Sequence, residues 1–169
     1  MAFTPPVPSA KLYAAIRAEL IRQFVPGPGS LHGPDHWQRV EDCAVHLAQT
    51  SGGDAMVAHW FGIFHDAGRH SEGADSRHGH RGALLVERYR DRLGLTDTQL
   101  DLLLWACEQH ADGHTTDDPT VGACWDADRL DLPRVGIFPD PKYLSTAAGK
   151  ALAVRFSHSP SGGHPDDFD

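Results

Sequence analysis

The stretch FGIFHDAG, residues 61–68, decides the fold that the sequence predicts. It closes a segment that starts near residue 55 and is apolar on nearly every side, which is typical of a helix at the centre of a domain. The segment ends in an imidazole and a carboxylate side by side, His65 and Asp66. The pair proves nothing alone, because 12 histidines occur in 169 residues. It gains meaning only if other helices bring metal-binding side chains to the same point.

Helical patterns occupy the chain on both sides of this stretch. We expect N-terminal caps at Ser9, Asp54 and Thr96, the last in a capping box with Gln99, and a stop at Gly94. The expected helices cover roughly 10–24, 34–50, 55–66, 78–93, 96–110, 120–132 and a last span from residue 141 to about 156. Because no useful run alternates as a β-strand does, the sequence predicts an all-α fold, a single-domain helical bundle of about six to seven helices.

The length indicates one domain, since 169 residues can build a proper core without staples. Residues 1–8 are proline-rich and are interpreted as an N-terminal arm. Residues 9–156 are expected to form the helical domain, and the polar end 157–169 is expected to be a disordered tail. We find no internal repeat and no second domain.

The composition excludes several classes of function. The net charge of −8 argues against binding to duplex nucleic acid, although local arginines or a metal would still admit a small phosphorylated substrate. Three cysteines form no CxxC motif and are interpreted as buried free thiols of a reducing cytosol. No signal peptide and no long apolar run are present, so the sequence predicts a cytoplasmic protein without membrane insertion. The oligomeric state stays open.

Several of the expected helices finish an apolar face with one histidine or aspartate. His36 and His110 end the inward stripes of their helices, and Asp128 extends the stripe of the helix over 120–132. Asp126 lies about 200° away around a helix of 3.6 residues per turn and is interpreted as a bystander. Burying several such groups unpaired would cost several kcal/mol, and a bound metal would satisfy them together.

Two histidines compete for one position on the helix over 78–93. His78 leads an apolar stripe, whereas His80 also shares its face with apolar residues, so the choice between them stays open with His78 favoured. Imidazole and carboxylate ligands favour a divalent transition metal, Mn, Fe, Ni or Zn, as one or two ions. The absence of thiolate ligands argues against a closed structural zinc site.

The order His36, His65-Asp66, Asp128 resembles the HD superfamily of metal-dependent phosphohydrolases. The matching motifs are HGPDHWQRV (32–40), FHDAGR (64–69), ADRLD (127–131) and HGHRG (78–82), the last similar to the HxxxG of two-metal members. His110 in EQHADG looks like their later histidine. The resemblance covers roughly residues 30–132.

The resemblance implies an all-helical fold and a set of metal ligands. The first metal would be held by His36, His65, Asp66 and Asp128. The second would be held by His78, His110 and the shared Asp66. The chain lacks the acidic pair of the HDxxED motif that alarmone hydrolases of the family carry. It also lacks the GYP signature of the branch that hydrolyses cyclic dinucleotides. These differences argue against alarmones and against cyclic dinucleotides as substrates.

These observations together predict a metal-dependent phosphohydrolase that acts on a phosphate ester or anhydride of a small substrate, a nucleotide first. Asp66 positions the ion, Arg69 steadies negative charge, and Glu72 or Asp75 is the candidate general acid. Positive charge for a phosphate is also offered by Arg39, Arg81, Arg129 and Lys142. Two alternatives remain, an HD-like di-iron oxygenase and a non-catalytic metal-stabilised binding domain. His32 is interpreted as an outer or entry-loop residue and His59 as a hydrogen-bonded core residue.

Overall fold

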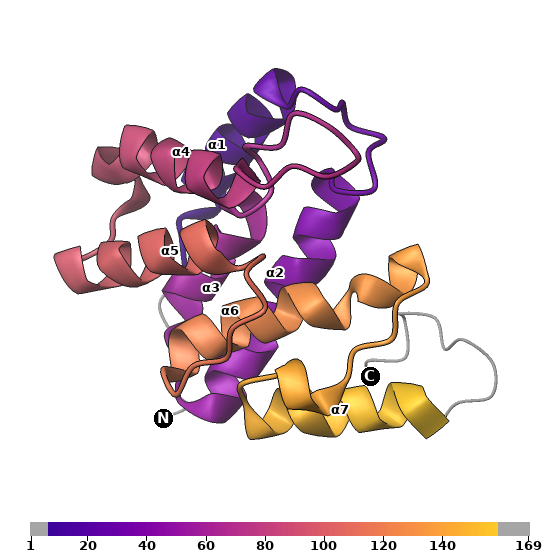
Figure 1. Cartoon of the computed structure of the whole chain (residues 1–169). Helices are drawn as coiled ribbons and strands as arrows, with labels where there is room; N and C mark the ends of the chain where they lie inside the picture. The colour runs from indigo at the N-terminus through magenta and orange to yellow at the C-terminus, as the bar shows by residue number, and fades with distance from the viewer. Residues whose placement is uncertain (1–6, 159–169) are drawn as a thin grey trace.

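The computed structural model describes residues 7–158, and these residues form helices and connecting loops without a strand (Figure 1). The α-helices are α1 (Ala10–Gln23), α2 (Pro34–Ser51), α3 (Ala55–Phe64), α4 (His78–Leu93), α5 (Asp97–Gln109), α6 (Pro119–Leu130) and α7 (Ala147–His158). Two short 3₁₀ helices, η1 (Leu132–Val135) and η2 (Pro141–Tyr143), lie between α6 and α7. The predicted all-α bundle is confirmed, whereas the two 3₁₀ helices were not foreseen.

The ends of the helices follow the expected capping chemistry at most positions. The carboxylate of Asp54 accepts from the backbone amides of Met56 and Val57, and Thr96 with Gln99 forms a complete capping box. The prediction for Ser9 was wrong, because its side chain makes no capping hydrogen bond and α1 begins without one.

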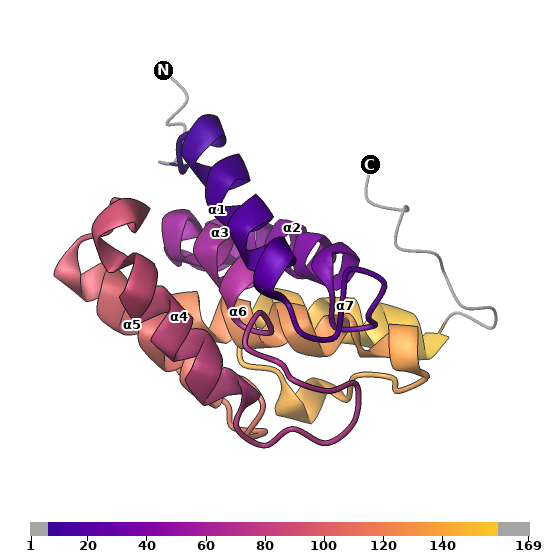
Figure 2. The same cartoon turned by 90° about the horizontal axis from the view of Figure 1, so that it is seen from above.

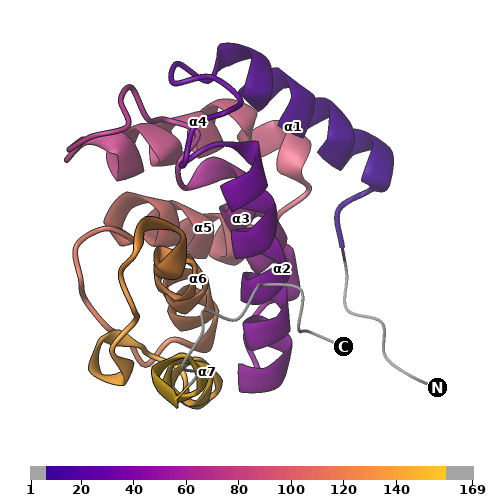
Figure 3. The same ribbon diagram turned by 90° about the vertical axis from the view of Figure 1, so that its right-hand side faces the viewer.

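The core lies between α2, α3 and α6. Helix α3 is buried over nearly its whole length, which explains why its sequence is apolar on all sides. Helix α2 packs on both α3 and α6, while α4 and α5 lie side by side as a pair (Figure 2). Helix α1 covers one side of the bundle and α7 the opposite side (Figure 3). This arrangement directs the end of α3 toward the start of α4 and the middle of the molecule.

A close approach at Gly82 brings α4 against the end of α3. A Cβ at this position would lie 2.8 Å from the carbonyl oxygen of Phe64 and 2.9 Å from that of His65. Any side chain larger than a hydrogen atom would therefore push α4 away from His65. The glycine of the HGHRG motif has a packing reason, since it lets His78 at the start of α4 reach the end of α3.

The predicted arm and the predicted tail lie largely outside the described residues. Of the expected arm, 1–8, only residues 7 and 8 are described. Of the predicted tail, 157–169, only residues 157 and 158 are described, as the last residues of α7. Among the residues that are described, no helix combines the length and hydrophobicity that crossing a bilayer requires.

Replacing Gly82 by alanine is expected to destabilise the fold by about 1–3 kcal/mol, because the added methyl group overpacks the contact between α4 and α3. Urea denaturation followed by circular dichroism measures this change in the free energy of unfolding. Gly29→Ala is the matched control, since a Cβ there meets no atom within 4 Å, and its effect should stay within about 0.5 kcal/mol. An unchanged midpoint for Gly82→Ala would contradict the close packing.

Candidate metal centre

The His-Asp pair lies where α3 ends and the chain turns toward the loop before α4. His65 is the C-terminal cap residue of α3 and is fully buried, and Asp66 follows it with 2% of its surface exposed. The turn is closed by a hydrogen bond from the amide of Arg69 to the carbonyl oxygen of Asp66. The apolar helix therefore carries an imidazole and a carboxylate into the interior, where both need partners.

A first group of ligand atoms forms around Nε2 of His36, which α2 supplies. This nitrogen lies 3.1 Å from Nε2 of His65, 3.5 Å from Oδ2 of Asp66 and 3.3 Å from Oδ1 of Asp128. Nε2 of His65 is 3.8 Å from the same two oxygen atoms. The four residues that the sequence assigned to a first metal thus gather at one point, from α2, the end of α3 and α6.

A second group forms on the other side of Asp66. Nε2 of His78, the first residue of α4, lies 2.9 Å from Nε2 of His110, which follows α5. Both nitrogens face Oδ1 of Asp66, at 3.3 Å and 3.5 Å. The two oxygens of one carboxylate are therefore divided, with Oδ2 facing the first group and Oδ1 facing the second.

The four histidines are all held by hydrogen bonds from Nδ1. His36 donates to Oδ2 of Asp131 at 2.7 Å, and His65 donates to the carbonyl oxygens of Phe61 and Gly62. His110 donates to the carbonyl oxygen of Cys107 at 2.8 Å, and His78 donates in the same way to that of Asp75. An acceptor oxygen requires a proton on Nδ1, so in each neutral ring Nε2 carries the lone pair.

The Nε2 lone pairs consequently face each other at two places. His36 faces His65 across 3.1 Å, and His78 faces His110 across 2.9 Å. Such contacts are repulsive between two neutral rings unless a metal ion or a proton lies between the nitrogens. In the described part of the chain three groups of ligand atoms lie close enough to hold a metal ion: His36 with His65 and Asp128, His32 with His36 and Asp66, and Asp66 with His78 and His110. Their donor set of imidazole and carboxylate fits a divalent transition metal. The residues present therefore fit the metal that the sequence predicted.

Burial and charge set the ionisation of the centre. Burial lowers the pKa of His65 to about 3, so this ring is neutral and available as a ligand. Burial alone would raise the pKa of Asp66 and Asp128, but the surrounding histidines outweigh it and hold both values below the ordinary range for a carboxyl group. Burial also lowers the pKa of His78, whereas for His36 and His110 the neighbouring carboxylates outweigh burial and raise the pKa. The site thus offers ionised carboxylates, and a metal would compete with a proton at His36 and His110.

The two competing residues of the sequence prediction lie elsewhere. Asp126 is fully buried and accepts hydrogen bonds from the backbone amides of Ser145 and Thr146, each at 2.7 Å. It therefore fixes the start of α7 instead of facing the histidines. His80 lies at the surface, where its Nδ1 is 3.0 Å from Oε1 of Glu108.

The predicted catalytic residues occupy unlike positions. Nε of Arg69 donates to Oδ1 of Asp66 at 3.0 Å, so this arginine lies directly against the shared carboxylate. Glu72 is exposed in the loop before α4. Asp75 binds Arg81 and accepts from the amide of His70, which makes it a structural residue of the loop.

Most of the other candidate cations are already bound. Arg39 donates two hydrogen bonds to Asp131, and Lys142 is paired with Asp140. Arg129 donates to the carbonyl oxygen of Tyr143 at 2.6 Å. Arg39 and Lys142 are therefore paired with carboxylates, whereas the second terminal nitrogen of Arg129 is buried without a hydrogen-bond partner and Arg129 lines the cavity at the centre.

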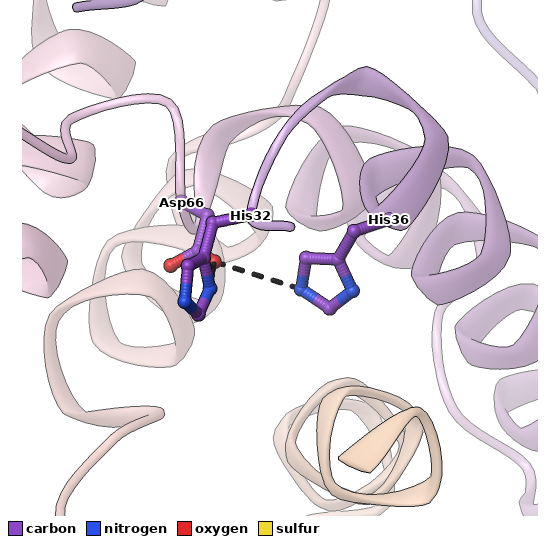
Figure 4. A group of neighbouring side chains, drawn as sticks. All are labelled: His32, His36 and Asp66. Carbon is purple, nitrogen blue, oxygen red and sulfur yellow. Dashed lines mark hydrogen bonds and ion pairs between the residues drawn. The ribbon is translucent and has the colours of Figure 1, made fainter. Parts of the chain in front are cut away.

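Three residues near the centre were not assigned to it from the sequence. Nδ1 of His32 is 3.1 Å from Oδ2 of Asp66, within one of the candidate ligand groups (Figure 4). Asp131 orients His36, and a terminal nitrogen of Arg134 lies 3.4 Å from Nε2 of His36. His32 and Asp131 lie within the motifs HGPDH and ADRLD, so their place in these motifs could have indicated a role at the centre. No sequence pattern indicated such a role for Arg134.

A cavity of about 470 Å³ opens on the centre. Asp66, Arg69, His78, His110 and Asp128 line it, together with residues of the segment that joins α6 to α7. Its volume falls within the range of about 300–1,000 Å³ typical of small-molecule sites. A small ligand in this cavity would contact the candidate metal centre directly.

Comparison with known proteins supports the fold. No protein-family model matches the sequence, and no curated protein is significantly similar to it. Among solved structures, a predicted HD superfamily hydrolase from an uncultured Thermotogales bacterium matches 88% of this chain over 85% of its own, with a TM-score of 0.69 and 22% sequence identity. The chain therefore has an HD-domain fold, and the resemblance read from its motifs is confirmed at the level of the fold.

Substitution of Asp126 by alanine should lower stability, whereas substitution of Asp128 by alanine should lower metal binding. Asp126→Ala leaves the amides of Ser145 and Thr146 without their acceptor, so we expect the free energy of unfolding to fall by about 2–4 kcal/mol with metal content retained. Asp128→Ala should lower metal content without a comparable loss of stability. Thermal denaturation and metal analysis of both variants decide this, and loss of metal from Asp126→Ala alone would reverse the assignment.

Asp131→Asn tests the orientation of His36. The amide keeps the shape of the carboxylate but removes the charge that holds Nδ1–H, and we expect metal affinity to fall by about 10- to 100-fold. Isothermal titration with Mn²⁺ or Zn²⁺ measures the change. Asp112→Asn, an exposed site, serves as control, and equal affinities for the two variants would contradict the role given to Asp131.

Proposed function

We propose that the chain is a metal-dependent phosphohydrolase that uses one or two divalent transition-metal ions to hydrolyse a small phosphate ester or anhydride, with a nucleotide as the first candidate. One observation carries the proposal. The carboxylate of Asp66 faces the Nε2 atoms of His36 and His65 with one oxygen and those of His78 and His110 with the other, and Asp66, His78, His110 and Asp128 line one cavity. A cytoplasmic location is proposed with it, because Cys43, Cys107 and Cys124 are free thiols.

The ligands in this proposal are those predicted from the sequence. His36, His65, Asp66 and Asp128 would hold one ion, and His78 and His110 with Asp66 would hold the other. The chemistry that divalent metal supplies in such a site is the activation of water near neutral pH and the neutralisation of phosphoryl charge. Because Asp66 faces the two groups with different oxygens, its carboxylate would contribute a ligand to each ion.

The protein contributes orientation and charge around the reacting phosphate. Arg69 lies against Asp66 and lines the cavity, so its guanidinium is placed to steady negative charge that develops on the phosphoryl group. Hydrolysis breaks the bond from phosphorus to the leaving oxygen, which must take up a proton. Glu72 is the proposed donor, and because it is exposed in its loop, this role requires the loop to close over a bound substrate.

Asp66→Ala should abolish metal binding and hydrolysis together. Removing the shared carboxylate takes a ligand from both groups, and we expect kcat/KM to fall by at least about 1,000-fold. The measurement combines metal analysis with phosphate release from a panel of nucleotides and phosphodiesters, for protein purified without chelator. Asp112→Ala is the control.

The same experiment separates the alternatives. Normal hydrolysis by metal-depleted Asp66→Ala would overturn the proposal. Turnover that requires dioxygen and bound iron, with none on Mn²⁺, would instead identify an oxygenase. Bound metal without turnover of any compound would identify a non-catalytic binding domain.

A further inference from the structure

The cavity over the candidate metal centre has two unlike kinds of lining. Residues of the centre that line it are His32, Asp66, Arg69, His78, His110 and Asp128. The segment 132–144, which joins α6 to α7 and is called the joining segment below, also lines it. The apolar lining residues of this segment, called the apolar wall below, are Leu132, Ile137, Phe138, Pro139, Tyr143 and Leu144.

The joining segment is tied to the body of the protein near both ends. Nε of Arg134 donates to the carbonyl oxygen of Leu31 at 3.0 Å, and Arg129 of α6 donates to that of Tyr143. Leu144 is almost fully buried and anchors the segment beside α7. The backbone of the apolar wall is therefore fixed in place relative to the centre.

Between these anchors the segment presents large apolar side chains to solvent. Ile137 is 55% exposed, Phe138 is 61% exposed and Tyr143 is 53% exposed. Single exposed apolar residues are ordinary, but here three lie together and line the same cavity as the ligand cluster. An apolar wall facing a few convergent polar groups is the usual design of a small-molecule site.

The same segment also reaches the polar end of the cavity. The outer terminal nitrogen of Arg134 lies 3.3 Å from Nδ1 of His32 and 3.4 Å from Nε2 of His36. Its other nitrogens are held by Leu31 and by Asp131, so only this nitrogen is directed at the centre. One segment thus offers a cation beside the candidate metal centre and rings farther along the wall.

We propose that the joining segment binds the substrate, with Arg134 on the phosphate and with Phe138 and Tyr143 on an aromatic ring carried by the leaving group, as in a nucleoside 5′-monophosphate. This inference rests on the proposed phosphohydrolase function and adds its substrate class. Because ring contacts recognise a π-face and not a pattern of donors, the site distinguishes the presence of a base and accepts different bases.

The test compares nucleoside 5′-monophosphates with ribose 5-phosphate, which contain the same ester bond and differ only in the base. We expect a lower KM for AMP and UMP than for ribose 5-phosphate. Phe138→Ala should raise the KM for both nucleotides by about 5- to 100-fold and leave that for ribose 5-phosphate unchanged. Phe138→Leu, which keeps apolar surface without a ring, should lie between. Leu84→Ala, equally exposed on α4, is the control.

A binding measurement keeps this inference separate from the proposed activity. Calorimetry on metal-free protein in EDTA should show tighter binding of AMP than of ribose 5-phosphate, and Phe138→Ala should remove the difference. Equal binding of the two compounds, or binding of neither, overturns the inference even if hydrolysis is found. If AMP binds preferentially but nothing is hydrolysed, the proposed function fails and the ring-binding wall stands.

Self-association is the competing explanation for the exposed rings, and size-exclusion chromatography of the same variants detects it. A change in oligomeric state on Phe138→Ala, with KM and AMP binding unaltered, would overturn the inference. An unchanged elution volume together with the loss of base preference supports it.

Discussion

The fixed orientation of four buried imidazole rings is the constraint on which the rest of the site depends. Each ring gives its Nδ1 proton to an oxygen on its outer side, which leaves the Nε2 lone pair directed inward. Facing lone pairs on neutral rings are stabilised only by a metal ion or a proton between them. The packing of α2 to α6 therefore builds a candidate metal centre, because these helices supply both the rings and the oxygens that orient them.

Charge is distributed around the centre in a consistent way. Asp66 and Asp128 face inward as ionised carboxylates, and Asp131 stands behind His36, where Arg39 balances it. Arg69 approaches Asp66 from the cavity side. The overall acidity of the chain is thus compatible with a phosphorylated ligand, because three arginines, Arg69, Arg129 and Arg134, line the cavity.

Two parts of the fold have different roles in the proposed function. The helices α2 to α6 build a buried centre whose side chains are held in one orientation by hydrogen bonds. The joining segment carries exposed rings on a short, anchored stretch of chain. Changes of sequence in the segment can alter the contacts with a ligand while the ligand cluster is kept.

The sequence by itself determined the helices and the chemistry of the inward faces, because periodicity and capping are local properties. It separated Asp128 from Asp126 through the turn of one helix, and it favoured His78 over His80. The prediction from the sequence failed at Ser9, whose side chain makes no capping hydrogen bond at the start of α1. The tertiary structure alone decided that Asp131 orients His36, that Arg134 enters the site and that the joining segment forms a wall. Those contacts join residues about a hundred positions apart, and their geometry follows from how helices pack, which no local pattern encodes.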